Sequence, residues 1–185
     1  KFDVPVIGVI LPGADMAAKE TRNKRIGVIG TRATINNQAY SKAIKEIDNK
    51  IEVFEKACPL FVPIAEEGWT HHPATYEIAE EYLKELRENN IDTLVLGCTH
   101  YPILADVIQE VIGKDVKLID SGIATAEVVR NEINRIGFET NSAVPGNLDL
   151  YVSDIPTTFK QVAELFLGKN INEVVKVDIE ELHKI

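Results

Sequence analysis

Short runs of β-branched and other apolar residues alternate with helix-type patterns along almost the whole chain. This alternation constrains the fold more than any other feature, because strand, helix and strand in succession form the unit of a parallel sheet. The 185 residues are enough for a sizeable hydrophobic core. The sequence therefore predicts an α/β fold with a largely parallel sheet.

The expected elements follow from the period of the apolar residues and from the turn residues between them. The expected strands are residues 4–10, 25–30, 51–54, 93–96, 116–119, 147–153 and 173–179. The expected helices are residues 14–20, 31–47, 73–88, 102–112, 120–136 and 156–168. Pro12 and Gly13 are expected to end the first strand, and the proline-bracketed segment 58–69 is expected to be a loop with a short strand.

Charge and targeting signals narrow the functional class. The formal net charge is −9, and the basic residues form only the short run 19–25, so direct nucleic-acid binding is disfavoured. The sequence has no apolar run of membrane-spanning length and no signal-peptide order, which predicts a cytoplasmic protein without membrane contact. We expect its two cysteines, Cys58 and Cys98, to be reduced thiols.

The segment "TLVLGCTHYPIL" draws attention to Cys98, because the apolar strand stops at this thiol and polar residues follow. Ligands bind beyond the carboxyl ends of parallel strands, where the next helices present their N-termini. A helix N-terminus stabilises a thiolate, so we expect a lowered pKa for Cys98 and a role as base or nucleophile. The alternative is a buried structural cysteine; Gly97 and His100 beside it favour function. The "CTH" segment supplies too few ligands for zinc, so no metal is expected.

Other strand ends carry hydroxyl residues that could join the same site. Thr31 and Thr34 follow the second expected strand, and Ser121 follows the fifth. Taken singly, each is more often a helix cap. Glu66 is explained by an exposed acidic turn, and Cys58, in an apolar setting, is interpreted as structural.

Four segments in order, "PVIGVILPGA", "IGVIGTRATI", "ACPLFVPIAEEGW" and "LVLGCTHYPIL", resemble the glutamate racemase family of the aspartate/glutamate racemase superfamily. The resemblance spans essentially the whole chain. It implies a fold of two pseudo-symmetric, doubly wound α/β domains with mainly parallel sheets and an active site between them. It also implies cofactor-independent interconversion of L- and D-glutamate for peptidoglycan synthesis, in a homodimer.

The resemblance also implies roles for individual residues. Cys98 matches the second of two catalytic cysteines, and His100 matches the histidine that assists it. The positions that match substrate-binding residues are Thr99, Thr31, Thr34 and Glu66.

The sequence departs from the family pattern at its start. Family members carry an Asp-Ser-Gly segment, a Tyr-Gly segment and a first cysteine in a Cys-Asn-Thr motif upstream of "PVIGV", and the 185 residues include none of them there. The resemblance therefore predicts one intact domain, residues 11–119, while residues 1–10 and 120–185 would be the remainder of an incomplete domain. We expect the chain alone to be inactive as a racemase.

Inversion of an α-carbon without a cofactor requires one group to remove a proton and another to return one to the opposite face. Two thiols that flank the substrate can do this, and Cys98 would be one of them. Two alternatives remain open on the sequence. One is a related enzyme such as an aspartate racemase or a maleate-type isomerase, and the other is a non-catalytic binding module.

Overall fold

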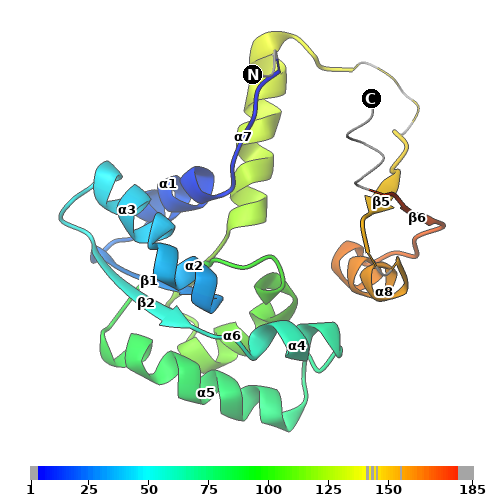
Figure 1. Ribbon diagram of the computed structural model, residues 1–185. Coiled ribbons are helices and arrows are strands. Elements are labelled where there is room, and N and C mark those ends of the chain that lie inside the picture. The colour runs from blue at the N-terminus through cyan, green and yellow to red at the C-terminus, as the bar shows by residue number, and fades with distance from the viewer. Residues whose placement is uncertain (1–3, 141, 143, 145, 155, 179–185) are drawn as a thin grey trace. The chain divides into compact units, whose positions relative to one another are not determined.

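The computed structural model of the protein describes residues 4–140, 142, 144, 146–154 and 156–178 (Figure 1). The chain forms two compact units, the first ending at Glu139 and the second beginning at Thr140. The first unit contains the sheet and the helices that position the candidate site.

The first unit is built on a four-stranded sheet with the order β2-β1-β3-β4, in which every pairing is parallel. Its strands are β1 (Arg25–Gly30), β2 (Glu52–Ala57), β3 (Thr93–Leu96) and β4 (Lys117–Asp120). The predictions for residues 25–30 and 93–96 are confirmed, and the other two strands lie one to three residues later than expected. The α/β fold with a parallel sheet is therefore confirmed.

Helices cover both faces of this sheet (Figure 1). They are α1 (Ile10–Glu20), α2 (Arg32–Asn37), α3 (Ala39–Ile47), α4 (Phe61–Glu66), α5 (Pro73–Glu88) and α6 (Ala105–Ile112). A further helix, α7 (Ser121–Ile136), follows β4, contacts α1 and extends away from the sheet. On one face Leu94 and Leu96 pack with residues of α4, α5 and α6, and on the other Val95 packs with residues of α1 and α3. This alternation along β3 is the two-residue period of a strand, and it places a hydrophobic core on each side of the sheet.

The expected strand at residues 4–10 is absent from the described structure. Residues 5–8 have no regular secondary structure, and Val6 is 78% exposed. The helix α1 begins at Ile10 and continues through Pro12 and Gly13, which we expected to break the chain. Proline is tolerated in the first turn of a helix because the backbone N–H that it lacks would have no partner there.

The expected loop at residues 58–69 contains a helix, α4 (Phe61–Glu66). Pro63 again lies in the first turn, where it does not interrupt the hydrogen bonds. Phe61, Ile64 and Ala65 recur at helical spacing and are all buried. The two prolines therefore did not indicate a loop, and the spacing of the apolar residues indicated the helix correctly.

Two expected helices are divided in the structure. The helix at residues 31–47 becomes α2 and α3, separated by Gln38 with a φ of 55°. The helix at residues 102–112 begins as a 3₁₀ turn, Tyr101–Leu104, and continues as α6. The prediction for residues 73–88 is confirmed as α5, with Leu83 buried in the core. These results concern boundaries, which sequence patterns define least well.

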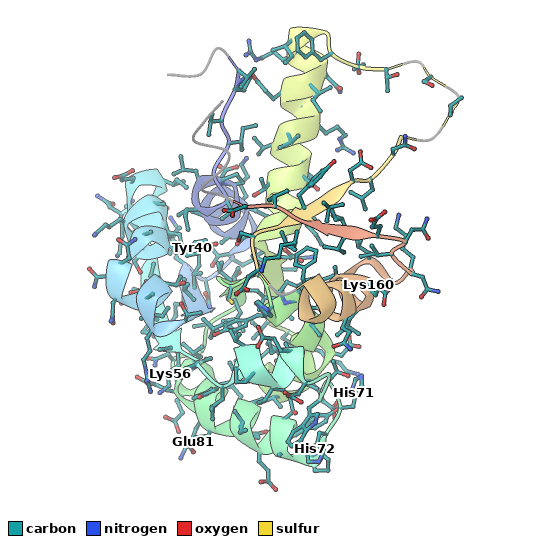
Figure 2. All side chains as sticks on the ribbon, turned by 45° about the vertical axis from the view of Figure 1, so that its right-hand side comes forward. Tyr40, Lys56, His71, His72, Glu81 and Lys160 are labelled. Carbon is teal, nitrogen blue, oxygen red and sulfur yellow. The ribbon has the colours of Figure 1, made fainter. Side chains whose placement is uncertain are left out.

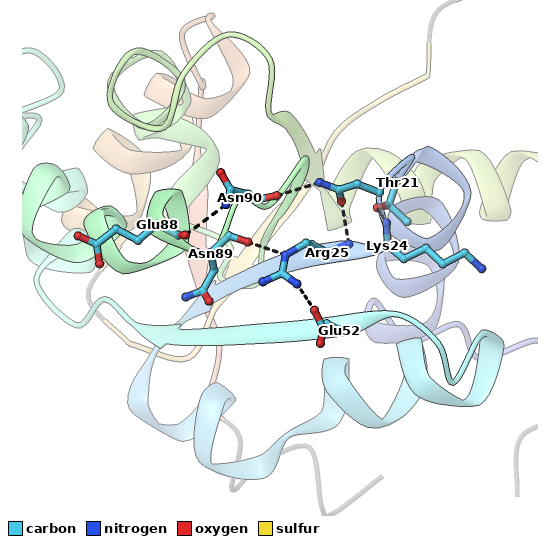
Figure 3. Close-up of polar contacts among 8 residues, drawn as sticks. Thr21, Lys24, Arg25, Glu52, Glu88, Asn89 and Asn90 are labelled. Carbon is cyan, nitrogen blue, oxygen red and sulfur yellow. Dashed lines mark hydrogen bonds and ion pairs between the residues drawn. The ribbon is translucent and has the colours of Figure 1, made fainter.

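The amino edge of the sheet is joined by polar contacts between distant segments (Figure 3). Arg25 Nε donates to the Asn89 carbonyl at 2.6 Å, and the Arg25 guanidinium also pairs with Glu52. Asn23 Nδ2 donates to the Asn90 carbonyl at 2.8 Å. These contacts tie the starts of β1 and β2 to the turn that precedes β3.

The second unit has two short parallel strands, β5 (Leu150–Val152) and β6 (Val174–Lys176), and the helix α8 (Pro156–Leu167). The expected helix ends as predicted at Gly168, which has the left-handed φ of 59° that glycine adopts readily. The expected strands 147–153 and 173–179 are shorter in the structure, and residue 179 lies outside the described residues. Among the described residues, no helix is both long and apolar enough to cross a membrane.

Candidate active site

The residues that follow the four parallel strands lie at one edge of the sheet. Thr31 follows β1, Cys58 follows β2, Cys98 follows β3 after Gly97, and Ser121 follows β4. The pairing of Ile29 with Leu96 and of Leu96 with Asp120 keeps three of these ends side by side. The carboxyl edge of a parallel sheet is where ligands bind in folds of this kind.

Cys98 lies in the turn between β3 and the 3₁₀ turn at Tyr101–Leu104. Its side chain is half-buried and packs against the core on the α4, α5 and α6 face. Gly97 immediately before it donates its N–H to the Ile29 carbonyl at 2.8 Å, which continues the sheet pairing to the residue next to the thiol. The sheet therefore places this thiol at the carboxyl edge.

The prediction of a lowered pKa for Cys98 is wrong in direction. Burial raises the pKa of the Cys98 thiol, and hydrogen bonds from the backbone N–H groups of His100 and Tyr101 lower it by less. The expected N–H donors are present, but they come from a turn and a 3₁₀ helix instead of a long α-helix. The larger cost of placing a thiolate in a partly apolar site outweighs them. In the free protein the thiol is the favoured form at neutral pH.

His100 and Glu66 come together from different elements. His100 Nε2 lies 3.4 Å from Glu66 Oε1, where Glu66 is the last residue of α4. On the other side of the ring, His100 Nδ1 lies 3.4 Å from Thr99 Oγ1. The structure therefore brings together three of the predicted site residues, two of which directly follow Cys98 in the chain.

Thr31 and Thr34 form a separate pair at the end of β1. The two hydroxyl oxygens are 3.0 Å apart, and Thr31 Oγ1 accepts a hydrogen bond from the Thr34 N–H at 3.2 Å. Thr31 thus caps α2, as the alternative interpretation expected. β1, which precedes Thr31, pairs with β3, which leads to Cys98. The two threonines therefore add hydroxyl groups to the same edge of the sheet.

Cys58, at the end of β2, differs from Cys98. It is fully buried, and burial raises its pKa to about 12. The buried Tyr101 hydroxyl donates to the Cys58 carbonyl at 2.7 Å, and the Tyr101 ring lies edge-on to Phe61. These contacts agree with the structural role that the sequence suggested for Cys58.

Tyr40 is a site neighbour that our sequence analysis missed. Its side chain is 3% exposed, and its hydroxyl lies 2.8 Å from Ser121 Oγ. Burial raises the pKa of Tyr40, its hydrogen bond with Ser121 lowers it, and electrostatic interactions with Cys98 and Asp120 raise it further. A signal was available, because Tyr40 belongs to the same apolar helix face as Ile44.

The chemistry available at this edge is acid–base chemistry on a small polar molecule. Cys98 and His100 can transfer protons, while Thr31, Thr34 and Thr99 offer hydroxyl groups to a carboxylate or an ammonium group. Among the described residues, no three His, Cys, Asp or Glu side chains gather in a way that could hold a metal ion.

The fold and this edge define a class of α/β protein with a half-buried thiol at the carboxyl end of a parallel strand. The sequence matches the family described as Asp/Glu/Hydantoin racemase over residues 1–129. The chain belongs to this family.

Similar proteins point to one branch of the family. A glutamate racemase of Geobacter metallireducens is 49% identical over 179 residues, which are 97% of this chain and 66% of that relative. The glutamate racemase isoform RacE1 of Bacillus anthracis has a crystal structure that matches 96% of this chain and 66% of its own, with a TM-score of 0.88 and 35% identity.

A second crystal structure adds a ligand. The glutamate racemase of Francisella tularensis, in complex with D-glutamate, matches 97% of this chain and 66% of its own, with a TM-score of 0.87 and 34% identity. This chain thus spans about two thirds of the length of the relatives that it matches.

Proposed function

We propose that this chain is part of a glutamate racemase, which interconverts L- and D-glutamate without a cofactor and supplies D-glutamate for peptidoglycan. The observation that carries the proposal is the half-buried Cys98 thiol at the carboxyl end of β3, followed two residues later by His100, whose Nε2 lies 3.4 Å from Glu66 Oε1. The support from relatives is the 49% identity with the Geobacter enzyme.

The residues at this edge suit the two halves of a racemisation. In one direction Cys98, as a thiol, gives its proton to the α-carbon after another base has removed the proton from the opposite face. In the other direction Cys98 must first lose its proton, and His100, held between Glu66 and Thr99, is proposed to assist this step. In each direction the enzyme removes one proton from the substrate and returns one proton to it.

The developing negative charge on the substrate needs hydrogen-bond donors. A proton on an α-carbon is very weakly acidic, and donors placed at the adjacent carboxylate stabilise the carbanion. The hydroxyl groups of Thr31, Thr34 and Thr99 are proposed to supply them, in line with the substrate-binding roles that the family resemblance implies. Glu66, at the end of α4, is proposed to contact the substrate from the His100 side.

The other thiol in the sequence is not available for the opposite face. Cys58 is fully buried, and its pKa of about 12 makes a thiolate unfavourable at neutral pH. We therefore expect the 185 residues alone to exchange the α-hydrogen of glutamate on at most one face, without inversion. The whole reaction requires a second thiol or an equivalent base.

Some finer expectations rest on the resemblance alone. We propose that residues 11–119 form one domain of the racemase and that residues 1–10 and 120–185 belong to the other. Of these, residues 1–3 and 179–185 lie outside the described residues. We also propose a homodimer in the cytoplasm, which sedimentation analysis and cell fractionation would test.

Proton NMR of L-glutamate in D₂O tests the proposal. Three proteins are compared: the chain itself, the chain fused to the part of the Geobacter relative that it does not match, and the same fusion with Cys98→Ala. We expect D-glutamate only from the fusion, and a loss of about 10²–10⁴-fold on Cys98→Ala, as for removal of a general acid or base. Cys58→Ala in the fusion is the matched control and should retain turnover.

A fusion that folds but leaves the α-hydrogen of glutamate untouched would refute the glutamate assignment. Aspartate and maleate would then be tested, since the related enzymes use the same thiol chemistry.

A non-catalytic binding module is the second candidate, and the raised pKa of Cys98 favours it. It predicts that the fusion binds glutamate in calorimetry without α-hydrogen exchange.

A further inference from the structure

Tyr40 connects four elements of the first unit beside the candidate site. It lies on α3 (Figure 2), and its hydroxyl is 2.8 Å from the oxygen of Ser121, the first residue of α7. Both side chains are buried. Because a buried hydroxyl is costly without a partner, this pair holds α3 and α7 in a defined arrangement.

The ring of Tyr40 fills a space that two glycines leave open. A Cβ atom at position 97 would lie 3.1 Å from Tyr40 Cε2, and one at position 13 would lie 3.2 Å from Tyr40 Cε1. The first glycine ends the β3 segment and the second belongs to α1. The ring is therefore in close contact with backbone on both sides, where larger residues would not fit.

The contact at Gly97 is the important one, because Gly97 directly precedes Cys98 in the chain. The same Cβ would lie 2.7 Å from the Ile29 carbonyl oxygen, which accepts a hydrogen bond from the Gly97 N–H at 2.8 Å. The Gly97 backbone is thus hydrogen-bonded to β1 and lies close to the Tyr40 ring. A rotation of this peptide would move the thiol that follows it.

We propose that Tyr40 is a positioning residue for Cys98: its ring, anchored by Ser121, presses on Gly97 and so holds the Cys98 thiol at its half-buried place. The importance of that place for catalysis rests on the proposed function. The positioning itself does not, because it can be measured on the thiol without any substrate.

The two cysteines provide an internal comparison for the experiment. The folded 185-residue chain is treated with iodoacetamide at one pH, and alkylation of Cys98 and of Cys58 is followed separately by mass spectrometry of their peptides. Cys58 is fully buried and reports general opening of the fold. The ratio of the two rates therefore separates a local movement of Cys98 from a loss of stability, which would raise both.

Tyr40→Leu removes the ring and is expected to raise the alkylation rate of Cys98 by about threefold or more, with Cys58 unchanged. Tyr40→Phe keeps the ring between the glycines and is expected to retain the original rate. The matched control is Ile44→Ala, a fully buried residue on the same helix, which should leave the ratio unchanged. If Tyr40→Leu does not fold, Tyr40→Met fills the space with a flexible side chain and should show the same selective rise.

Three results would overturn the inference. One is a Cys98 rate in the folded Leu or Met variant equal to that of the unmodified chain. Another is an equal rise for both cysteines, or a rise of the same size in Ile44→Ala, which would indicate general loosening. The third is an equal rise in Tyr40→Phe, which would show that the ring does not hold Gly97. A negative result here leaves the NMR test of racemisation unaffected, and a failure of that test leaves this one intact.

Discussion

At the amino edge of the four-stranded sheet, the Asp92 carboxylate accepts four short hydrogen bonds, whereas at the opposite edge His100 has two contacts of 3.4 Å. The donors to Asp92 are the Thr21 hydroxyl and the N–H groups of Arg22 and Asn23, each at 2.7 Å, and the Thr93 hydroxyl at 2.9 Å. The contacts of His100 are with Glu66 and Thr99.

This difference separates a structural edge of the sheet from the edge that carries the candidate site. Three of the four donors to Asp92 belong to residues about 70 positions away in the sequence. The groups around Cys98 are loosely paired and keep capacity for another molecule. A charged residue with many short contacts therefore indicates a fold anchor, and sparse long contacts at a strand end indicate room for a ligand.

The comparison predicts the largest loss of stability at the amino edge. Asp92→Ala removes one acceptor and leaves four donors without it, two of them backbone N–H groups. We expect the free energy of unfolding to fall by about 2–3 kcal/mol, since hydrogen bonds to a charged group are strong but Asp92 is only partly buried. Urea unfolding of the 185-residue chain measures the change.

Asp48→Ala is the control for this change. The Asp48 side chain is 32% exposed, pairs with Lys24 at 2.7 Å and accepts a hydrogen bond from the Lys50 N–H at 2.9 Å. Because it has two partners instead of four, its loss should have a smaller effect. Equal losses for the two variants would show that Asp92 is not a special anchor.

The same carboxylate should make stability depend on pH. Burial raises the pKa of Asp92, but hydrogen bonds from Thr21, Asn23, Arg22 and Thr93 lower it by more, so the folded-state pKa lies below its ordinary value. As the pH falls, Asp92 therefore takes up its proton in the unfolded chain before it does so in the folded protein. The stabilisation by the Asp92 carboxylate is fully present above the unfolded pKa of about 3.9, and it is lost as the pH falls through the folded-state pKa.

Urea unfolding between about pH 6 and about pH 2.5 tests this dependence, because that interval includes the ordinary Asp pKa of about 3.9. Asp92→Asn should flatten part of the acid decline, because the amide does not titrate. An unchanged slope in this variant would assign the decline to other carboxylates.

The sequence located the functional edge better than the structural one, for a physical reason. Cys98 and Thr31 follow strands that local apolar patterns define, so their place at the carboxyl edge could be predicted. Asp92 could not be recognised, because its donors, including Thr21, come from a distant segment. The direction of the Cys98 pKa also depends on burial, which no local pattern reports.

The errors in the fold have a similar origin. The apolar residues of segment 4–10 resemble a buried strand, yet Val6 is exposed in the structure, because a strand forms only where a neighbour pairs with it. Tyr40 lies within the helix expected at residues 31–47, but the sequence did not single it out, because its contact with Ser121 spans 81 positions. Helix α5 was predicted to the residue because its amphipathic period is long and uninterrupted.

The smallest effect on stability is expected at the loosely paired edge. Glu66→Gln removes the charge that faces His100 at 3.4 Å, and the Glu66 side chain is 43% exposed. We expect the free energy of unfolding to change by less than about 0.5 kcal/mol, as for other solvent-exposed ion pairs. In the fusion protein the same change should lower glutamate turnover, because Glu66 is proposed to orient His100 and to contact the substrate.

Glu67→Gln is the matched control, since Glu67 is the adjacent exposed acidic residue at the end of α4. It should alter neither the urea transition nor turnover. A loss of stability in Glu66→Gln as large as that of Asp92→Ala would contradict the distinction between the two edges, because the pair with His100 would then be an anchor. A loss of turnover without loss of stability would place Glu66 in the site, since a residue that only supports the fold affects activity through stability.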